Sequence, residues 1–128
     1  MTTREVIEAY FECINSGKWD AWVELFSTAI VIDEAISGHM EGLDAVRQSA
    51  EGIRNGFERF ENRVEELVVE GNRAMVVCRI DAVLRGGVPL VSTGANFYRV
   101  EGGKIVYMSS YHDSAPFMKA FAQAQQGK

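Results

Sequence analysis

At 128 residues, with 47% hydrophobic and 24% charged side chains, the chain has the size and composition of one globular domain spanning residues 1–128. Its net charge of −5 argues against nucleic acid as the main partner, because binding to phosphates requires a positively charged surface. No apolar run approaches the roughly 18 residues of a membrane span, and the first residues lack the basic leader and apolar segment of a secretory signal. We therefore expect no membrane association and a cytoplasmic location, in which Cys13 and Cys78 stay reduced and buried.

The first half of the chain predicts three helices and one strand. Thr2 and Glu5 have the spacing of a capping box, and Gly17 provides a left-handed stop for the helix between them. A second short helix is expected over 19–26, a strand over 30–32, and a third, amphipathic helix over 43–57. The segment 37–42 between them is rich in turn-forming residues.

After residue 58 the spacing of the apolar residues changes from the helical period to every second residue, which predicts strands. Short glycine-containing segments separate the strands, and such connections force neighbours to be antiparallel. The terminal segment 117–125 is expected to form a turn or short helix. The four predicted strands are 60–70, 73–85, 88–100 and 104–113.

This order of elements predicts an α+β fold, in which a cone-shaped, curved antiparallel sheet (a β-meander) packs against three N-terminal helices. A long meander twists strongly, and its concave side must be covered. Because only the helical first half is available as cover, the architecture predicts a pocket at one end of the cone. We expect that pocket to hold a small, largely apolar molecule.

Two stretches of the chain resemble the nuclear transport factor 2-like (SnoaL-like) superfamily. The opening, from Tyr10 through the tryptophan-rich 19–26 to Val31-Ile32-Asp33, is similar to the start of these domains, and 97–105 with 111–113 is similar to their end. The resemblance covers about residues 3–118 and implies the same cone-shaped fold. It implies no single activity, since this fold hosts isomerases, dehydratases, cyclases, epoxide hydrolases and non-enzymes.

One enzyme branch of that superfamily, the limonene-epoxide hydrolases, carries Arg-x-Asp on one strand and a second Asp closing the last strand. Arg79, Asp81 and Asp113 occupy similar places here, although the residues that hold the attacking water in that branch have no clear counterpart. An arginine between two carboxylates can keep one ionised and one protonated, which supplies an acid and a base for opening an epoxide. This hypothesis requires Arg79 and Asp81 to face the pocket; the alternative is that they lie on the wet side of the strand.

A second branch, the ketosteroid isomerases, carries a tyrosine in the first helix, an aspartate after the first strand and an acid on the third meander strand. Tyr10 and Asp33 resemble the first two, while Asn96 replaces the acid. The resemblance implies that Asp33 moves a proton beside a carbonyl and that Tyr10, helped by Asn96, stabilises the oxyanion. Tyr10 as a core aromatic and Asp33 as a turn carboxylate are the structural alternatives.

The end of the last strand leaves a further choice open. His112 and Asp113 are adjacent, so only one of them should enter the pocket of a regular strand, and His112 there would be a candidate acid or base. Trp22, Phe57 and Val83 are expected, with Asn96, to contact the substrate. The two histidines lie far apart and no phosphate-binding glycine loop is present, so we expect neither a metal nor a cofactor.

These observations favour a cofactor-free enzyme that uses acid–base chemistry on a small apolar metabolite, with epoxide opening (hydrolysis or cyclisation) as the leading reaction. A proton-transfer isomerase and a non-catalytic ligand-binding module are the alternatives. The apolar strand residues on the convex side of the sheet need cover, which predicts a homodimer.

Overall fold

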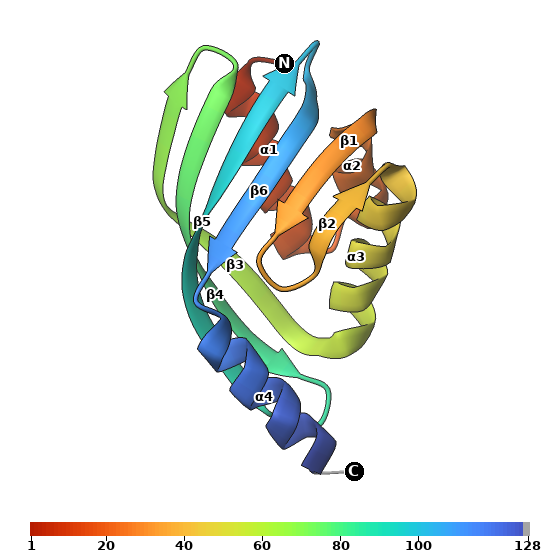
Figure 1. The fold of residues 1–128 in the computed structure, drawn as a ribbon, viewed down its shortest axis with the longest axis vertical. Coiled ribbons are helices and arrows are strands. Elements are labelled where there is room, and N and C mark those ends of the chain that lie inside the picture. The colour runs from red at the N-terminus through yellow and green to blue at the C-terminus, as the bar shows by residue number, and fades with distance from the viewer. Residues whose placement is uncertain (127–128) are drawn as a thin grey trace.

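The computed structural model describes residues 1–126 and has an α+β architecture of four helices and six strands within that range. The strands form one curved, open sheet, and α1, α2 and α3 are grouped against it while α4 lies at the far end (Figure 1). The elements are α1 (Thr3–Ser16), α2 (Trp19–Glu24), β1 (Phe26–Glu34), β2 (Gly38–Glu41), α3 (Leu43–Gly56), β3 (Phe57–Glu70), β4 (Arg73–Leu84), β5 (Pro89–Glu101), β6 (Lys104–His112) and α4 (Ser114–Gln126).

Both predicted signals that delimit the first helix are confirmed. The Thr2 hydroxyl accepts from the Glu5 amide at 3.2 Å, and the Glu5 carboxylate accepts from the Thr2 amide at 2.9 Å. This reciprocal pair satisfies two amides that have no partner inside the helix. At the other end Gly17 has a φ of 69°, a left-handed conformation that glycine adopts without strain.

The predicted antiparallel meander is confirmed in β3 to β6, and the structure adds β1 and β2, whose pairing makes the whole sheet mixed. Its strand order is β2-β1-β6-β5-β4-β3, and β1 runs parallel to β6 while the other neighbours are antiparallel. The parallel pairing arises because the long connection through α3 and the meander returns the chain beside β1. The segment 37–42, expected as turns, contains β2, which pairs with β1 in a short hairpin (Figure 1).

Burial along β4 decides which face of the sheet is covered. Every second residue from Ala74 to Leu84 is buried, whereas the residues between them are exposed or half-buried. The buried set includes Val76, Cys78 and Ile80 and packs toward the helices. We call this side the inner face of the sheet and the opposite side the outer face.

The inner face carries two separate apolar clusters. The larger joins α1, α2 and α3 to one end of the sheet, and the smaller lies at the other end. Helix α4 covers the smaller cluster through Phe117 and Ala120, which pack with Ile80, Leu84 and Leu90. The C-terminal segment thus forms a helix of 13 residues. No helix within the described range is long and apolar enough to cross a membrane.

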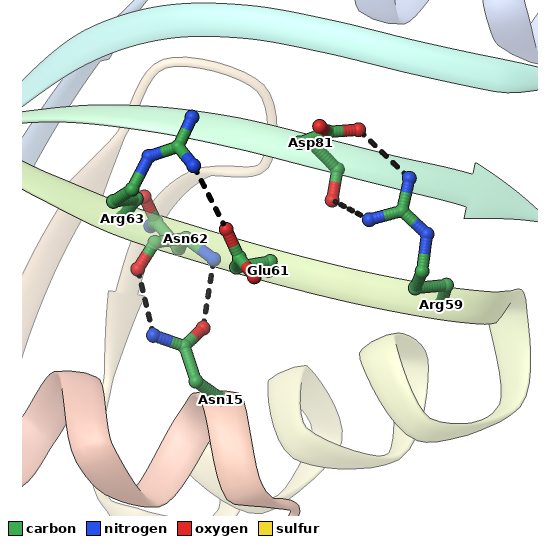
Figure 2. Close-up of polar contacts among 6 residues, drawn as sticks. All are labelled: Asn15, Arg59, Glu61, Asn62, Arg63 and Asp81. Atoms are coloured by element: carbon green, nitrogen blue, oxygen red, sulfur yellow. Dashed lines mark hydrogen bonds and ion pairs between the residues drawn. The ribbon is translucent and has the colours of Figure 1, made fainter.

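Helix α1 also protects the free edge of the sheet, as Figure 2 shows. The Asn15 side chain donates to the Asn62 carbonyl at 2.9 Å and accepts from the Asn62 amide at 2.7 Å. Asn62 belongs to β3, the edge strand, so these backbone groups point away from β4. One side-chain amide therefore replaces a missing strand partner, which discourages pairing with another chain.

Candidate functional site

Polar side chains gather on the inner face between the two apolar clusters. In the register of the sheet, Glu34 of β1 lies opposite Ser110 of β6, and Ser110 lies opposite Asn96 of β5. The next positions pair His112 with Gly94. Side chains of directly opposed residues project from the same face, so Glu34, Ser110, Asn96 and His112 share the inner face.

Buried polar groups connect this row to helix α1. The Asn96 Nδ2 group donates to the Tyr98 hydroxyl at 2.9 Å, and the Tyr98 ring packs against that of Tyr10 with centroids 5.2 Å apart. Burial raises the pKa of Tyr10 and raises that of Tyr98 well above its ordinary value. Both phenols therefore keep their protons and serve as hydrogen-bond donors.

The Glu34 carboxylate is held by the start of the β1–β2 turn. Its oxygens accept from the amides of Ile36 and Ser37 at 3.2 and 2.6 Å, and Ser110 Oγ lies 3.4 Å away. The residue is half-buried. Its charge adds to the burial effect on the pKa of Tyr10 and opposes it at His112, so the three groups share one electrostatic environment.

His112 lies over Gly94, and its ring fits there because glycine has no side chain. A Cβ atom added at Gly94 would be 2.3 Å from His112 Nδ1 and 2.7 Å from the Tyr111 carbonyl oxygen. The ring packs against Phe117 of α4 with centroids 5.9 Å apart. Burial lowers the pKa of His112, so the imidazole is neutral near pH 7 and can accept or donate a proton.

Four buried polar atoms have no hydrogen-bond partner among the described residues. They are Trp22 Nε1, Asn62 Oδ1, Asn96 Oδ1 and His112 Nδ1. A buried polar group without a partner is costly, so such groups concentrate where a ligand or a bound molecule completes them. Asn96 and His112 both belong to the polar row, which marks it as the candidate site.

The ring-opening hypothesis required Arg79 and Asp81 to face inward, and this orientation is wrong. Both lie between the buried residues of β4 and therefore on the outer face. Asp81 pairs with Arg59 at 2.8 Å, and its side chain is 38% exposed (Figure 2). The Arg59 hydrogen bond lowers the pKa of Asp81, so it remains ionised. Successive residues of a strand point to opposite faces. The helices cover the face that carries Cys78 and Ile80, which leaves Arg79 and Asp81 on the other face.

Asp33 is likewise on the outer face, because it directly precedes the inward-facing Glu34 and successive strand residues point to opposite faces. It accepts from His39 Nδ1 at 2.6 Å and from the Tyr107 hydroxyl at 2.7 Å. These hydrogen bonds lower the pKa of Asp33 and the first of them raises that of His39, which also bonds to Glu41 at 2.8 Å. The inward carboxylate on this strand is Glu34.

The structure settles the choice between His112 and Asp113 in favour of His112. Asp113 is exposed, and its carboxylate accepts from the Ala115 amide at 3.2 Å, where it caps the start of α4. Arg79, Asp81 and Asp113 are therefore not gathered at one inner site.

The remaining predicted contact residues are divided between the two faces. Trp22 is buried, 5.6 Å from Tyr10 between ring centroids, and Phe57 packs against Phe60 in the smaller cluster. Val83 is on the outer face and half-buried.

Sequence reasoning missed Glu34, Tyr98 and Ser110. The period of two that starts at the buried Ile30 and Ile32 points to Glu34 as the next inward residue, so a signal for it was present.

Two surface grooves lie on the helical side, away from the polar row. One has a volume of about 420 Å³ and is bordered by Phe26, Leu43 and Lys104; the other, of about 160 Å³, lies between α2 and α3 beside Trp19. No residue of the polar row lines either groove. Within residues 1–126, no three His, Cys, Asp or Glu side chains are grouped so that they could hold a metal ion.

Comparison with known proteins supports the fold. A family model described as a SnoaL-like domain matches residues 7–108. An NTF2-like protein of Burkholderia thailandensis superposes with a TM-score of 0.85 at 19% identity, covering 94% of this chain and 98% of that one. No curated protein matches the sequence significantly.

Two further solved structures carry a named activity. A protein of Pseudomonas putida KT2440, proposed to be a polyketide cyclase, has a TM-score of 0.79 at 20% identity and covers 94% of this chain and 98% of its own. An LEH-like epoxide hydrolase of M. tuberculosis has a TM-score of 0.80 at 12% identity, with 94% and 90% covered. At these identities the likeness concerns the fold alone.

Proposed function

The chain belongs to the family of SnoaL-like domains, and from that membership and the polar row we propose that it is a cofactor-free enzyme that moves protons on a small, largely apolar carbonyl compound. Glu34 is the general base in this proposal. The observation that carries it is an inward carboxylate beside two buried, protonated phenols and a neutral histidine. Titratable groups with different environments in one site are typical of acid–base catalysis.

The proposed reaction starts with Glu34 removing a proton from the carbon next to the carbonyl. The electron pair of that C–H bond moves to the carbonyl oxygen and forms an enolate, while Glu34 becomes a neutral acid. Tyr10 keeps its proton and donates a hydrogen bond to the enolate oxygen, which stabilises the developing charge. Glu34 then returns the abstracted proton to carbon and becomes a carboxylate again, so atoms and charge balance.

Ring opening through Arg79, Asp81 and Asp113 is not part of this proposal. Two of these side chains project from the outer face, and the third caps α4. Proton transfer needs only groups that the inner face already carries, which is why the isomerase-type reaction is preferred over the epoxide reaction.

The proposal is tested with 2-tetralone, an apolar bicyclic ketone with acidic α-hydrogens. In D2O the protein should accelerate exchange of those hydrogens, followed by proton NMR. Glu34→Gln keeps the shape and removes the base, and should slow exchange by roughly 100-fold. Asp33→Asn is the matched control, because the neighbouring carboxylate lies on the outer face and its loss should leave exchange within about twofold.

Exchange by Glu34→Gln at the rate of the unmodified protein would rule out Glu34 as the base. Binding of 2-tetralone by calorimetry without any accelerated exchange would instead identify the chain as a ligand-binding module, the non-catalytic alternative.

A further inference from the structure

The amide of Asn96 has one end bound and one end free. The residue is 1% exposed, its Nδ2 donates to the Tyr98 hydroxyl at 2.9 Å, and its Oδ1 has no partner among the described residues. Asn96 Oδ1 is therefore a buried hydrogen-bond acceptor that lacks a donor. The isomerase-like expectation had assigned it the opposite role, as a donor to an oxyanion.

The hydrogen bond to Tyr98 fixes this orientation of the amide. Because Nδ2 donates to the Tyr98 hydroxyl at 2.9 Å, the Oδ1 atom on the other side of the planar amide is turned away from the tyrosine and has no partner among the described residues.

The row around Asn96 contains a carboxylate. Glu34 stands in the same row as Asn96, with Ser110 between them. Among the described residues, the buried polar side chains are asparagines and serines, and none is a lysine or arginine. An anionic ligand would meet a carboxylate and no buried positive charge, which costs free energy.

We infer that this site accepts a neutral, largely apolar molecule that carries a hydroxyl group, that the hydroxyl donates to Asn96 Oδ1, and that carboxylates are rejected. The inference rests on the proposed function for the location of the site. It makes Asn96 a residue that determines specificity for hydroxyl-bearing compounds, such as hydroxyketones, over ketones without a donor.

Three probes of one ring size test this directly by isothermal titration calorimetry. 2-Naphthol offers a donor, 2-methoxynaphthalene keeps the oxygen and loses the donor, and 2-naphthoate is an anion. We expect 2-naphthol to bind roughly tenfold more tightly than either of the others. Asn96→Leu should reduce the difference between the two neutral probes to about twofold. Thr93→Val, on the exposed outer face of the same strand, should preserve the full difference.

If Asn96→Leu does not fold, Tyr98→Phe gives a second variant that distinguishes Asn96 from Glu34 as the acceptor. It removes the partner that holds the amide, so the amide can turn and the preference for 2-naphthol should weaken. Equal binding of the two neutral probes, or tightest binding of 2-naphthoate, would overturn the inference. Because no turnover is measured, these outcomes are independent of whether 2-tetralone exchange is found.

Discussion

The two histidines of this chain lie in opposite electrostatic environments. His39 bridges Asp33 and Glu41 on the outer face, and these hydrogen bonds raise its pKa. His112 is largely enclosed between Gly94 and Phe117, and burial lowers its pKa. With only two histidines present, an NMR titration of the ring resonances should show one midpoint above about 6.5 and one below it.

Opposite effects on stability follow from the two shifts. The contribution of His39 is present below pH ~6.5, its unfolded value, and is lost as the pH rises through its higher folded value. For His112 the unfolded state binds the proton more readily, so stability falls as the pH drops below ~6.5. Urea unfolding at pH 5.5 and 7.5 should show His39→Gln weakening the protein mainly at the lower pH. At pH 5.5, His112→Gln should reduce the loss of stability that the unmodified protein shows there. The reverse pattern would contradict the environments assigned to both histidines.

Gly94 is the residue whose substitution should be least tolerated on the inner face. A methyl group there would clash with the His112 ring and, because a backbone oxygen is also within 2.7 Å, the strand itself would have to move. We expect Gly94→Ala to lower the free energy of unfolding by about 1–3 kcal/mol. Gly52→Ala in α3 meets no atom within 4 Å and should be neutral or stabilising in the same denaturation experiment. Equal stability of the two variants would show that His112 does not occupy this position.

At the level of elements, the contact between α1 and the edge strand β3 is made by one side chain. Asn15→Ala removes both hydrogen bonds to the Asn62 backbone and should cost about 1–3 kcal/mol, measured by chemical denaturation. Asn55→Ala is the control, because that residue is exposed on α3 and its hydrogen bond to Arg85 is made by the backbone carbonyl, which the substitution keeps. A loss as large for Asn55→Ala would mean that the edge contact contributes nothing specific.

Helix α4 gives the sheet its second covered end. Its Phe117 links the smaller apolar cluster to His112, so the last element of the chain closes one side of the polar row. The existence of a terminal helix could be expected from its sequence, but its partners could not, since they come from β4 and β5, more than 20 residues earlier.

At the scale of the whole molecule, no helix of the described residues covers the outer face of the sheet, which carries exposed apolar residues beside its charged ones. The exposed apolar residues on β3 to β6 include Val68, Met75, Val77, Val91 and Tyr111. Exposed apolar residues gathered on one face are often covered by a partner, and a symmetric dimer is the commonest solution. We therefore expect a homodimer through this face.

Analytical ultracentrifugation at micromolar concentration should give a dimer for the unmodified protein. Val77→Glu places a charge at the centre of the outer face and should shift the population to monomer. Met118→Glu, an equally drastic change at an exposed position of α4, should leave the dimer intact. A monomeric unmodified protein would contradict the prediction.

The sequence alone determined the first helix with both its ends, the four strands of the meander and, through the family resemblance, the fold; it did not reveal β2 or the full length of β1. Capping residues, turn glycines and the change of period from helical to two act between near neighbours, so they can be recognised without knowing the fold. Tyr10, Asn96 and His112 came instead from the family resemblance, and all three lie on the covered face.

Only the tertiary structure decided which carboxylates face inward. Successive strand residues point to opposite faces, so a choice between Asp33 and Glu34, or between Arg79 and Ile80, depends on which face the helices cover. That cover is made by α1 to α4, which lie far from these strands in the chain. A one-residue difference in parity therefore moved the candidate base to Glu34 and placed the Arg79–Asp81 pair on the outer face.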